Sequence, residues 1–246
     1  MILKKLSILF KTIASINEPL GFILNYLNFS SVKVSTRGGQ KAMLRQNGID
    51  YWIFIENLIL DTYNLDKIKS RHFGTIIDIG SNIGMFTIKA STVWPLSNII
   101  CVEPNPESIL LLKKNTKLNK IKVKIINKAV VGSKKNKTIK LYFNENPAMA
   151  SVKIGIDKYV TVKTTLLSRV VSKAKKPLLL KMDIEGGEYS LLNNRNKKIF
   201  QQFDCILMET HDINNSLNSR HVKKYLNKIG FVVSVEDRNI TAINTY

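Results

Sequence analysis

The sequence contains few cysteines and few histidines. Its two cysteines, Cys101 and Cys205, each lie inside an apolar run, so we expect buried core thiols in a reducing compartment such as the cytoplasm, and no disulfide. No Cys-x-x-Cys pair or His/Cys cluster indicates structural zinc, and the three histidines are too scattered to form a metal site by themselves. We therefore predict a cytoplasmic protein without a metal site.

Acidic residues are also scarce. The chain has 38 lysines and arginines against 18 acids, which gives a net charge of +20. Such a charge favours acidic partners, namely a phosphorylated substrate, nucleic acid or an anionic lipid surface. The alternative, which we favour over specific nucleic-acid binding, is that the lysine runs are solvated surfaces of helices and loops.

No long apolar run begins the chain. The first 16 residues, MILKKLSILFKTIASI, are interrupted by Lys11 and have no small-residue cleavage site, so we expect neither a signal peptide nor a membrane span. Their apolar residues instead follow helical spacing, with the lysines off the stripe. We predict a helix that packs on the rest of the protein; the alternative is a basic amphipathic contact with an anionic membrane surface.

The glycine pattern of a dinucleotide site is incomplete. An apolar strand over residues 75–79 turns through residues 80–84, GSNIG, into a helix, and Asn82 stands where G-x-G-x-x-G requires its second glycine. The stretch fits D-x-G-x-x-x-G instead, with Asp78 as the acid. This pattern is typical of class I S-adenosylmethionine (SAM) methyltransferases, and a purely structural strand and turn is the alternative.

Apolar runs alternate with helical patterns along the rest of the chain. The order predicts an α/β fold of class I (Rossmann-like) methyltransferase type, with a seven-stranded, mostly parallel sheet and an antiparallel C-terminal hairpin. We assign residues 1–65 to an N-terminal helical and hairpin extension and residues 66–246 to a SAM-binding methyltransferase domain. The predicted strands of the sheet are 75–79, 98–103, 122–127, 178–180, 205–209, 231–235 and 240–244.

Other segments complete the prediction. In the extension we expect helices over residues 1–30, small strands over 31–55 that include Trp52 and Phe54, and a helix over 56–65. Later in the chain we expect helices at 188–202 and 215–228 and an inserted hairpin at 138–143 and 159–163. The loop of this hairpin, 146–151, would cover a site, and a simple surface hairpin is the alternative.

An acid ends the second strand of the domain. Glu103 lies about as far past Gly80 as the ribose-binding carboxylate of a doubly wound nucleotide fold, and a carboxylate can accept both vicinal hydroxyls. The alternative is an acid stabilised by the dipole of the following helix. After the third strand, the turn of Asn127, Lys128 and Ala129 would flank an adenine ring through backbone groups.

Ionisable residues also follow the fourth strand. The stretch PLLLKMDIEGGE, residues 177–188, places Lys181, Asp183, Glu185 and Glu188 at the sheet edge where open α/β folds bind ligands. Buried charges are costly unless they are paired, so this group indicates a site. An ion pair between Lys181 and Asp183 is the structural alternative.

Three blocks of the sequence together resemble the FkbM family of SAM-dependent methyltransferases. They are IIDIGSNIGMFT (76–87), CVEPNPESILLL (101–112) and LLLKMDIEGGEYSLL (178–192), of which the third carries the family's K-x-D-x-E-G-x-E hallmark. Asp50, Glu56 and Tyr63 resemble the family's lead-in segment, and Glu209 with His211 its E-x-H after the fifth strand. Leu167 stands where the family usually has an aspartate.

The resemblance implies methyl transfer from SAM, usually to a hydroxyl oxygen of a sugar, glycan, polyketide or other small molecule. Asp183, Glu185 or His211 would be the general base, and Lys181 or His211 would orient the acceptor; alternatively Asp183 faces the amine of SAM. The residues expected to hold SAM are Asp78, Gly80, Ser81, Asn82, Gly84, Phe86, Glu103, Pro104, Asn105, Asn127, Ala129, Glu56 and Tyr63.

Three other functions compete with this one. The net charge of +20 favours an RNA methyltransferase as the first alternative. However, an enzyme that methylates amino groups of bases usually has N/D-P-P-Y/F after the fourth strand, and this chain has MDIE there, at residues 182–185. A SAM- or nucleotide-binding module without turnover is the second. A divalent-metal O-methyltransferase, with Asp183 and either Asp212 or Asn214 as oxygen ligands, is the third.

Overall fold

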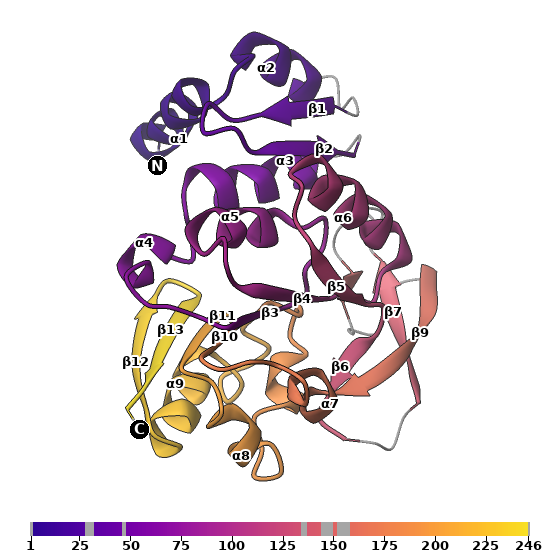
Figure 1. The fold of residues 1–246 in the computed structure, drawn as a ribbon, viewed down its shortest axis with the longest axis vertical. Helices are drawn as coiled ribbons and strands as arrows, with labels where there is room; N and C mark the ends of the chain where they lie inside the picture. The colour runs from indigo at the N-terminus through magenta and orange to yellow at the C-terminus, as the bar shows by residue number, and fades with distance from the viewer. Residues whose placement is uncertain are drawn as a thin grey trace.

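The centre of the molecule is a seven-stranded sheet with the spatial order β12-β13-β11-β10-β3-β4-β5 (Figure 1). Five neighbouring strands pair in parallel, and β13 alone of the seven runs in the opposite direction, antiparallel to both β11 and β12, which confirms the predicted fold class. The structure is a computed structural model that describes residues 2–27, 32–45, 48–133, 137–143, 150–151 and 158–245. The strands are β3 (Thr75–Ile79), β4 (Asn98–Val102), β5 (Val123–Ile126), β10 (Leu178–Met182), β11 (Cys205–Glu209), β12 (Phe231–Glu236) and β13 (Asn239–Asn244).

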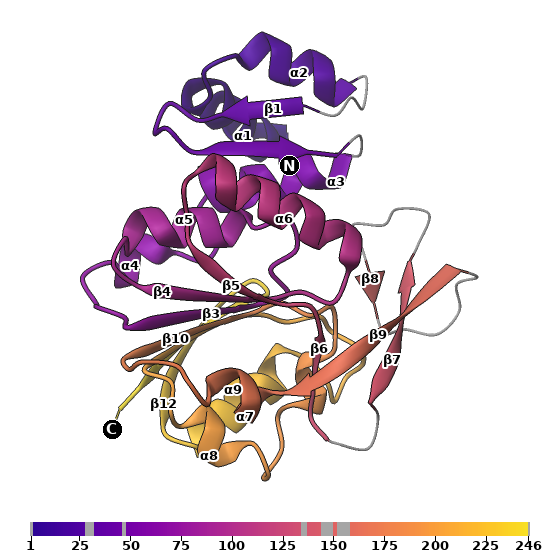
Figure 2. The same ribbon diagram turned by 45° about the vertical axis from the view of Figure 1, so that its right-hand side comes forward.

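Helices cover both faces of this sheet, as Figure 2 shows. For this reason β3 and β10 are apolar on both sides: Ile76 packs in one core cluster and its neighbour Ile77 in another. Because the chain leaves β3 toward β4 on one side and returns at β10 on the other, β3 and β10 flank the topological switch point, where such sheets bind ligands. The covering helices are α4 (Leu65–Ile68), α5 (Met85–Val93), α6 (Pro106–Leu118), α7 (Leu167–Val171), α8 (Lys197–Phe200) and α9 (Ser219–Lys228).

The N-terminal residues form a further layer outside α5 and α6 (Figure 1). Helix α5 lies between two cores, since Phe86 faces the sheet cluster while Met85 and Ile88 face an N-terminal cluster that contains Ile16 and Phe22. The sequence predicts that Pro19, Leu20 and Gly21 interrupt the helical region, but the break lies at residues 16–18 and Pro19 begins the second helix. The elements of this layer are α1 (Ile2–Ser15), α2 (Pro19–Leu27), β1 (Val32–Ser35), β2 (Lys41–Leu44), α3 (Gly48–Phe54) and the π-helical η1 (Ile55–Ile59). The division into domains at residue 65 stays a prediction.

The predicted strand through Trp52 and Phe54 is wrong. Residues 48–59 are continuously helical, because the buried apolar residues Tyr51, Phe54 and Leu58 follow a helical period rather than alternation. The helix predicted over 56–65 therefore begins earlier and ends at Ile59.

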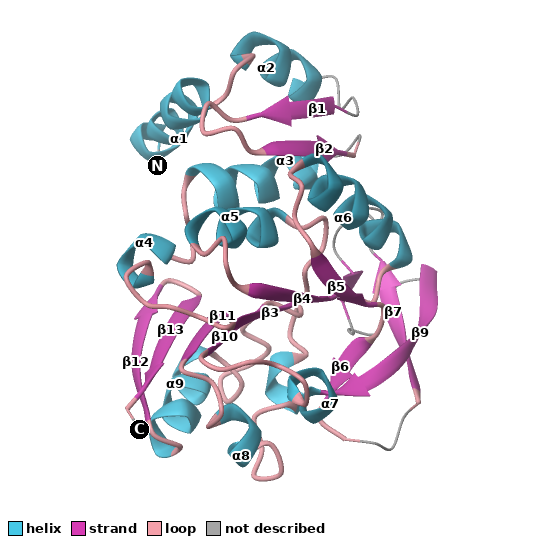
Figure 3. Cartoon of the chain, in the orientation of Figure 1, coloured by secondary structure: helices cyan, strands magenta, loops and turns pink. Residues whose placement is uncertain are grey.

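The helix predicted over residues 188–202 is also wrong. Only the 3-10 turn η2 (Glu188–Ser190) and α8 are helical there, as Figure 3 shows. Asparagine side chains take over backbone hydrogen bonds: Asn193 Oδ1 accepts from the amides of Arg195 and Asn196, and Asn196 Nδ2 donates to the Leu191 carbonyl. The helix predicted over 215–228 is confirmed from Ser219, where the Asn218 side chain caps it.

A second sheet, with the order β6-β9-β7-β8, flanks the main one. The predicted inserted hairpin is confirmed, because β7 and β9 pair antiparallel, whereas β6 was not predicted. Residues 146–149, most of the predicted covering loop, lie outside the described residues. The strands are β6 (Ala129–Val131), β7 (Thr138–Phe143), β8 (Ala150–Ser151) and β9 (Lys158–Leu166).

Candidate active site

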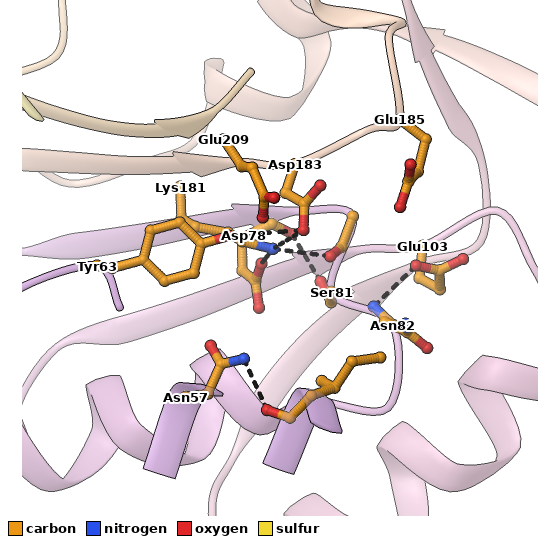
Figure 4. A network of polar contacts seen from close by, with 12 residues as sticks. Asn57, Tyr63, Asp78, Ser81, Asn82, Glu103, Lys181, Asp183, Glu185 and Glu209 are labelled. Atoms are coloured by element: carbon orange, nitrogen blue, oxygen red, sulfur yellow. Dashed lines mark hydrogen bonds and ion pairs between the residues drawn. The ribbon is translucent and has the colours of Figure 1, made fainter. Parts of the chain in front are cut away.

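The site begins with a buried ion pair between two neighbouring strands. Asp78 of β3 and Lys181 of β10 are register partners, and Lys181 Nζ lies 3.4 Å from Asp78 Oδ1 (Figure 4). The same ammonium group donates to the Gly80 carbonyl at 2.9 Å and lies 3.8 Å from Asp183 Oδ2. Burial alone would lower the pKa of Lys181, but the charges of Asp78 and Asp183 outweigh it and raise that pKa. Lys181 is thus a charged group whose nearest carboxylate is Asp78, rather than Asp183 as the structural alternative supposed.

The turn after β3 contains two glycines whose α-carbons lie against other parts of the chain. Gly80 has φ of +76°, and a Cβ there would lie 1.7 Å from the Asp183 carbonyl oxygen. Gly84 has φ of +90°, and its missing side chain leaves room for Leu112 of α6. Both glycines were among the residues expected to hold SAM. The structure shows that both admit other parts of the chain, although Gly80 also lines a cavity.

Glu103 connects this turn to the next strand. Its Oε2 accepts the Asn82 amide and its Oε1 the Asn105 amide, both at 2.8 Å. Burial raises the pKa of Glu103 to about 7, and the two amide hydrogen bonds offset the effect only in part. Asn105 caps α6 by accepting the Glu107 amide, and Asn127 donates to the carbonyls of Glu103 and Pro104. Asn127 therefore fixes the Glu103 turn.

A first cavity opens beside Glu103. The Glu103 carboxylate lies in its wall with Asn82, Pro104, Asn105 and Ala129, all predicted cofactor residues. Apolar side chains form the remaining wall, and those from β6 and β7 were not predicted. A carboxylate next to apolar walls suits a ribose and a flat adenine base, so these residues fit the nucleoside part of SAM. The apolar wall consists of Ile79, Val102, Val130, Ile139, Leu141 and Ile184.

A second cavity adjoins the first, and Gly80, Asn82, Asp183 and Glu185 line both. Its wall carries four of the predicted acids together with most of the remaining predicted residues. Asn57 was not predicted, and its buried Oδ1 has no hydrogen-bond partner among the residues that the structure describes, so it can accept from a hydroxyl or ammonium group of a ligand. The other predicted residues in this wall are Glu56, Tyr63, Ser81, Phe86, Lys181, Glu209 and His211.

His211 lies among four carboxylates. Its Nε2 is 3.4 Å from Glu185 and 3.9 Å from both Asp183 and Glu209, and its Nδ1 is 3.4 Å from Glu188. Burial would lower the pKa of His211, but the nearby Glu188 carboxylate and the charges of Glu185 and Asp183 raise it to about 9. The imidazole is therefore protonated at neutral pH, which favours a carboxylate over His211 as the general base.

Two further residues support the site. Glu188 is fully buried and accepts the amides of Gly186 and His211, each at 2.9 Å, so it joins the loops after β10 and β11. The sequence placed it in the ionisable group after the fourth strand but assigned it no role of its own. Arg45 pairs with Asp50 at 2.8 Å and reaches Asn82 Oδ1 at 3.4 Å, and no sequence pattern marked it.

Three glutamates of the second cavity, Glu56, Glu185 and Glu209, hold protons more tightly than usual. Burial, followed by the charge of Glu209, raises the pKa of Glu56 to about 7. Burial and the charge of Asp183 likewise raise the pKa values of Glu185 and Glu209. Tyr63 donates to Asp183 Oδ2 at 3.5 Å, and burial with the Asp183 charge raises the Tyr63 pKa well above its ordinary value. The cavity therefore has excess negative charge that suits a cationic or hydrogen-donating ligand.

The described residues bring together one group that could bind a metal ion. Ligand atoms of Asp183, Glu209 and His211 all lie within 4.8 Å of one another. The alternative ligands considered from the sequence are used elsewhere: Asp212 Oδ1 accepts the Ser219 amide, and Asn214 Oδ1 caps a turn. The protonated His211 supplies positive charge at this position.

Known proteins resemble the chain in sequence and in fold. Methyltransferase 1 of Beauveria bassiana (strain ARSEF 2860) is 23% identical over 185 residues, 65% of this chain and 73% of that protein. Ribosomal protein L11 methylase from Lactobacillus delbrueckii subsp. bulgaricus aligns with a TM-score of 0.44 and 11% identity over 76% of this chain and 77% of its own. A putative caffeoyl-CoA O-methyltransferase from Staphylococcus aureus aligns with a TM-score of 0.41 and 13% identity over 76% and 83%.

The family assignment rests on the sequence match. Residues 78–233 match the Methyltransferase FkbM domain, a span that is more than half of the chain. It runs from Asp78 of the buried ion pair through Glu103 and the acids after β10 to His211. The chain therefore belongs to the FkbM family of methyltransferases and is a SAM-dependent methyltransferase.

Proposed function

We propose that this protein transfers the methyl group of SAM to a hydroxyl oxygen of a sugar, a glycan or another small molecule. The observation that carries the proposal is the shared wall of the two cavities. Asp183 and Glu185 line both the cavity that suits a nucleoside and the acidic cavity beside it. An acceptor in the second cavity would therefore lie next to the cofactor, with carboxylates at the junction.

SAM, when bound, supplies an activated methyl group, so the protein has to orient the acceptor oxygen and remove its proton. We assign proton removal to Glu185. Its raised pKa makes it a stronger base than an ordinary glutamate, and it lies 3.4 Å from His211. Its φ of +52° is a strained backbone conformation for a residue with a side chain, of the kind often held at active sites.

The neighbouring residues would position the reacting groups. Asp183 lies within reach of Tyr63 and Lys181, so its carboxylate is fixed in orientation and suits the SAM amine or an acceptor hydroxyl. The protonated His211 would donate a hydrogen bond to the acceptor, and Glu188 holds it in place. The free Asn57 Oδ1 would accept a further hydrogen bond from the ligand.

The test has two stages. Calorimetry with SAM and the full chain comes first, followed by labelled-methyl transfer to sugars and glycans, to lipids and to RNA. We expect SAM to bind and label to enter a hydroxyl of a non-nucleic acceptor. Glu185→Gln should retain SAM binding and lose about 10²-fold or more in turnover. Failure to bind SAM, or full turnover of Glu185→Gln, would contradict the proposal.

An RNA acceptor is the second candidate, because the net charge of +20 favours a polyanion. The acids that line the second cavity oppose a phosphate group, so we place it second. Label found in RNA and in no other acceptor would establish this alternative instead.

A further inference from the structure

Helices α1 and α2 leave an apolar stripe uncovered on each. On α1 two exposed residues follow the first by three and four positions, and on α2 the successive spacings are four and three, so the exposed residues lie along one side of each helix. Phe10 and Leu20 are each 69% exposed, and half of the exposed large apolar side chains among the described residues belong to these two helices. The stripe residues are Leu6, Leu9 and Phe10 on α1 and Leu20, Leu24 and Leu27 on α2.

The opposite sides of both helices are firmly packed. Ile16, which follows α1, is fully buried, and Phe22 of α2 packs its ring against Tyr51 at 5.2 Å and Phe54 at 5.7 Å between ring centroids. The helices are therefore held in a fixed position with their stripes outward. Monomeric soluble proteins rarely leave such a continuous apolar area exposed, so this surface indicates a binding partner.

A groove of about 510 Å³ lies on the same surface. Leu9 and Leu27, one from each stripe, contribute to its mostly apolar lining, and Lys5 lies at its wall. Trp52 lines both this groove and the acidic second cavity of the active site. The apolar surface thus reaches the side of the site where the acceptor would bind.

The positive charge around the stripes indicates which kind of partner binds there. Residues 1–49 contain seven lysines and arginines and a single acid, Glu18, so their net charge is 7 − 1 = +6. Lys5 and Lys11 are exposed on α1 itself. Two copies of such a surface would repel each other, whereas leucine and phenylalanine next to lysine are the composition with which helices bind anionic lipid surfaces.

We propose that α1 and α2 dock the protein on an anionic lipid bilayer. The apolar stripes would lie between the lipid headgroups with the lysines over the phosphates. Among the described residues no helix is long and apolar enough to cross a bilayer, so the contact is with the surface. Docking would bring the mouth of the acidic cavity, at Trp52, next to the lipid.

Vesicle flotation with the full chain tests this proposal. We expect binding to vesicles of phosphatidylcholine with phosphatidylglycerol, little binding to phosphatidylcholine alone, and weaker binding at high salt. Phe10→Ser combined with Leu24→Ser should weaken binding at least about tenfold, because two large apolar side chains no longer enter the lipid. The matched control combines Leu96→Ser and Val232→Ser, which are as exposed but lie outside α1 and α2, and should bind normally.

Tryptophan fluorescence gives a second readout. Trp52 is 45% exposed and Trp94 is buried, so a blue shift on vesicle addition reports Trp52 entering an apolar environment. Unchanged circular dichroism will show that the variants fold. Absence of flotation with anionic vesicles, or equal flotation of the stripe variant, would overturn the proposal. So would a wild-type dimer that the stripe variant converts to monomers without any vesicle binding.

Discussion

The α-carbon of Gly80 lies directly against the carbonyl oxygen of Asp183, so that a Cβ at Gly80 would be 1.7 Å from that oxygen. The contact joins the turn after β3 to the loop after β10. These two segments also carry residues that line both cavities of the active site. The close approach of the two backbones therefore sets the junction where methyl transfer would take place.

Gly80→Ala should separate these two segments. We expect it to lower the free energy of unfolding by at least about 3 kcal/mol and to abolish SAM binding, because a methyl group must displace backbone atoms and adopt a left-handed φ. Urea unfolding and calorimetry measure the two effects.

Gly39→Ala is the matched control for the Gly80 substitution. Gly39 has φ of +89°, yet a Cβ there would meet nothing within 4 Å. Its substitution should cost only the backbone strain, about 1 kcal/mol, and leave SAM binding intact. If the two substitutions lower the free energy of unfolding equally, backbone strain rather than the contact with Asp183 accounts for the effect of Gly80→Ala.

The Lys181–Asp78 pair gives a second prediction. Lys181→Met should destabilise the protein by about 3–5 kcal/mol, because it leaves the Asp78 carboxylate buried without its cation. Asp78→Asn in the same chain should recover part of that loss, which a double-mutant cycle from urea unfolding will measure.

An exposed pair provides the control for the cycle. Lys67 and Glu236 form an ion pair at the surface, with both side chains more than half exposed. Lys67→Met should change the unfolding free energy little, because water screens that pair. If Lys181→Met proves as harmless as Lys67→Met, the buried pair does not stabilise the fold.

Much of the central sheet and of the turns at its edge could be predicted, because neighbouring residues in the sequence determine each of these features. The apolar run of β3, the acid that ends β4 and the turn into α6 each follow from neighbouring residues, and Glu103 lines a cavity as expected. The helix α3 was missed because residues 51–55, YWIFI, are an unbroken run of aromatic and β-branched residues, which favours a strand and is too short to separate the two periods.

Other features depend on contacts between distant residues. The fit of Gly80 against Asp183 joins positions 103 residues apart, and nothing next to Gly80 in the sequence signals it. The protonation of His211 likewise depends on acids gathered from the ends of two strands. The sequence therefore marked these residues as candidates without separating their roles.

Glu103 predicts a pH dependence of stability. Its pKa is raised from 4.5 to about 7 in the folded protein, so the native state holds a proton that the unfolded chain releases above pH 4.5. This contribution is fully present below pH 4.5 and is lost as the pH rises through 7. The unfolding free energy of the wild type should therefore fall by about 1–3 kcal/mol relative to Glu103→Gln over that range.

Urea unfolding at a series of pH values checks the Glu103 prediction. Glu107→Gln, at an exposed position four residues along the chain, should follow the wild type. A difference between the wild type and Glu103→Gln that stays constant with pH would exclude a raised Glu103 pKa.

Chelation tests the group of Asp183, Glu209 and His211. We expect dialysis against EDTA to leave methyl transfer unchanged, because the protonated imidazole already provides positive charge among these carboxylates. Labelled-methyl transfer before and after dialysis is the measurement. Activity lost with EDTA and restored by Mg²⁺ or Mn²⁺ would instead establish a metal ion at these three side chains.

Glu188 should control the protonation of His211. Glu188→Gln removes the charge 3.4 Å from His211 Nδ1, so the His211 pKa should fall from about 9 toward 6.5, as NMR titration of the imidazole would measure. Stability should fall by about 1–3 kcal/mol, because Glu188 also holds the amides of Gly186 and His211. Glu236→Gln, at an exposed acid near none of these groups, should leave the imidazole titration unchanged. An unchanged His211 pKa in Glu188→Gln would assign its protonation to Asp183 and Glu185 alone.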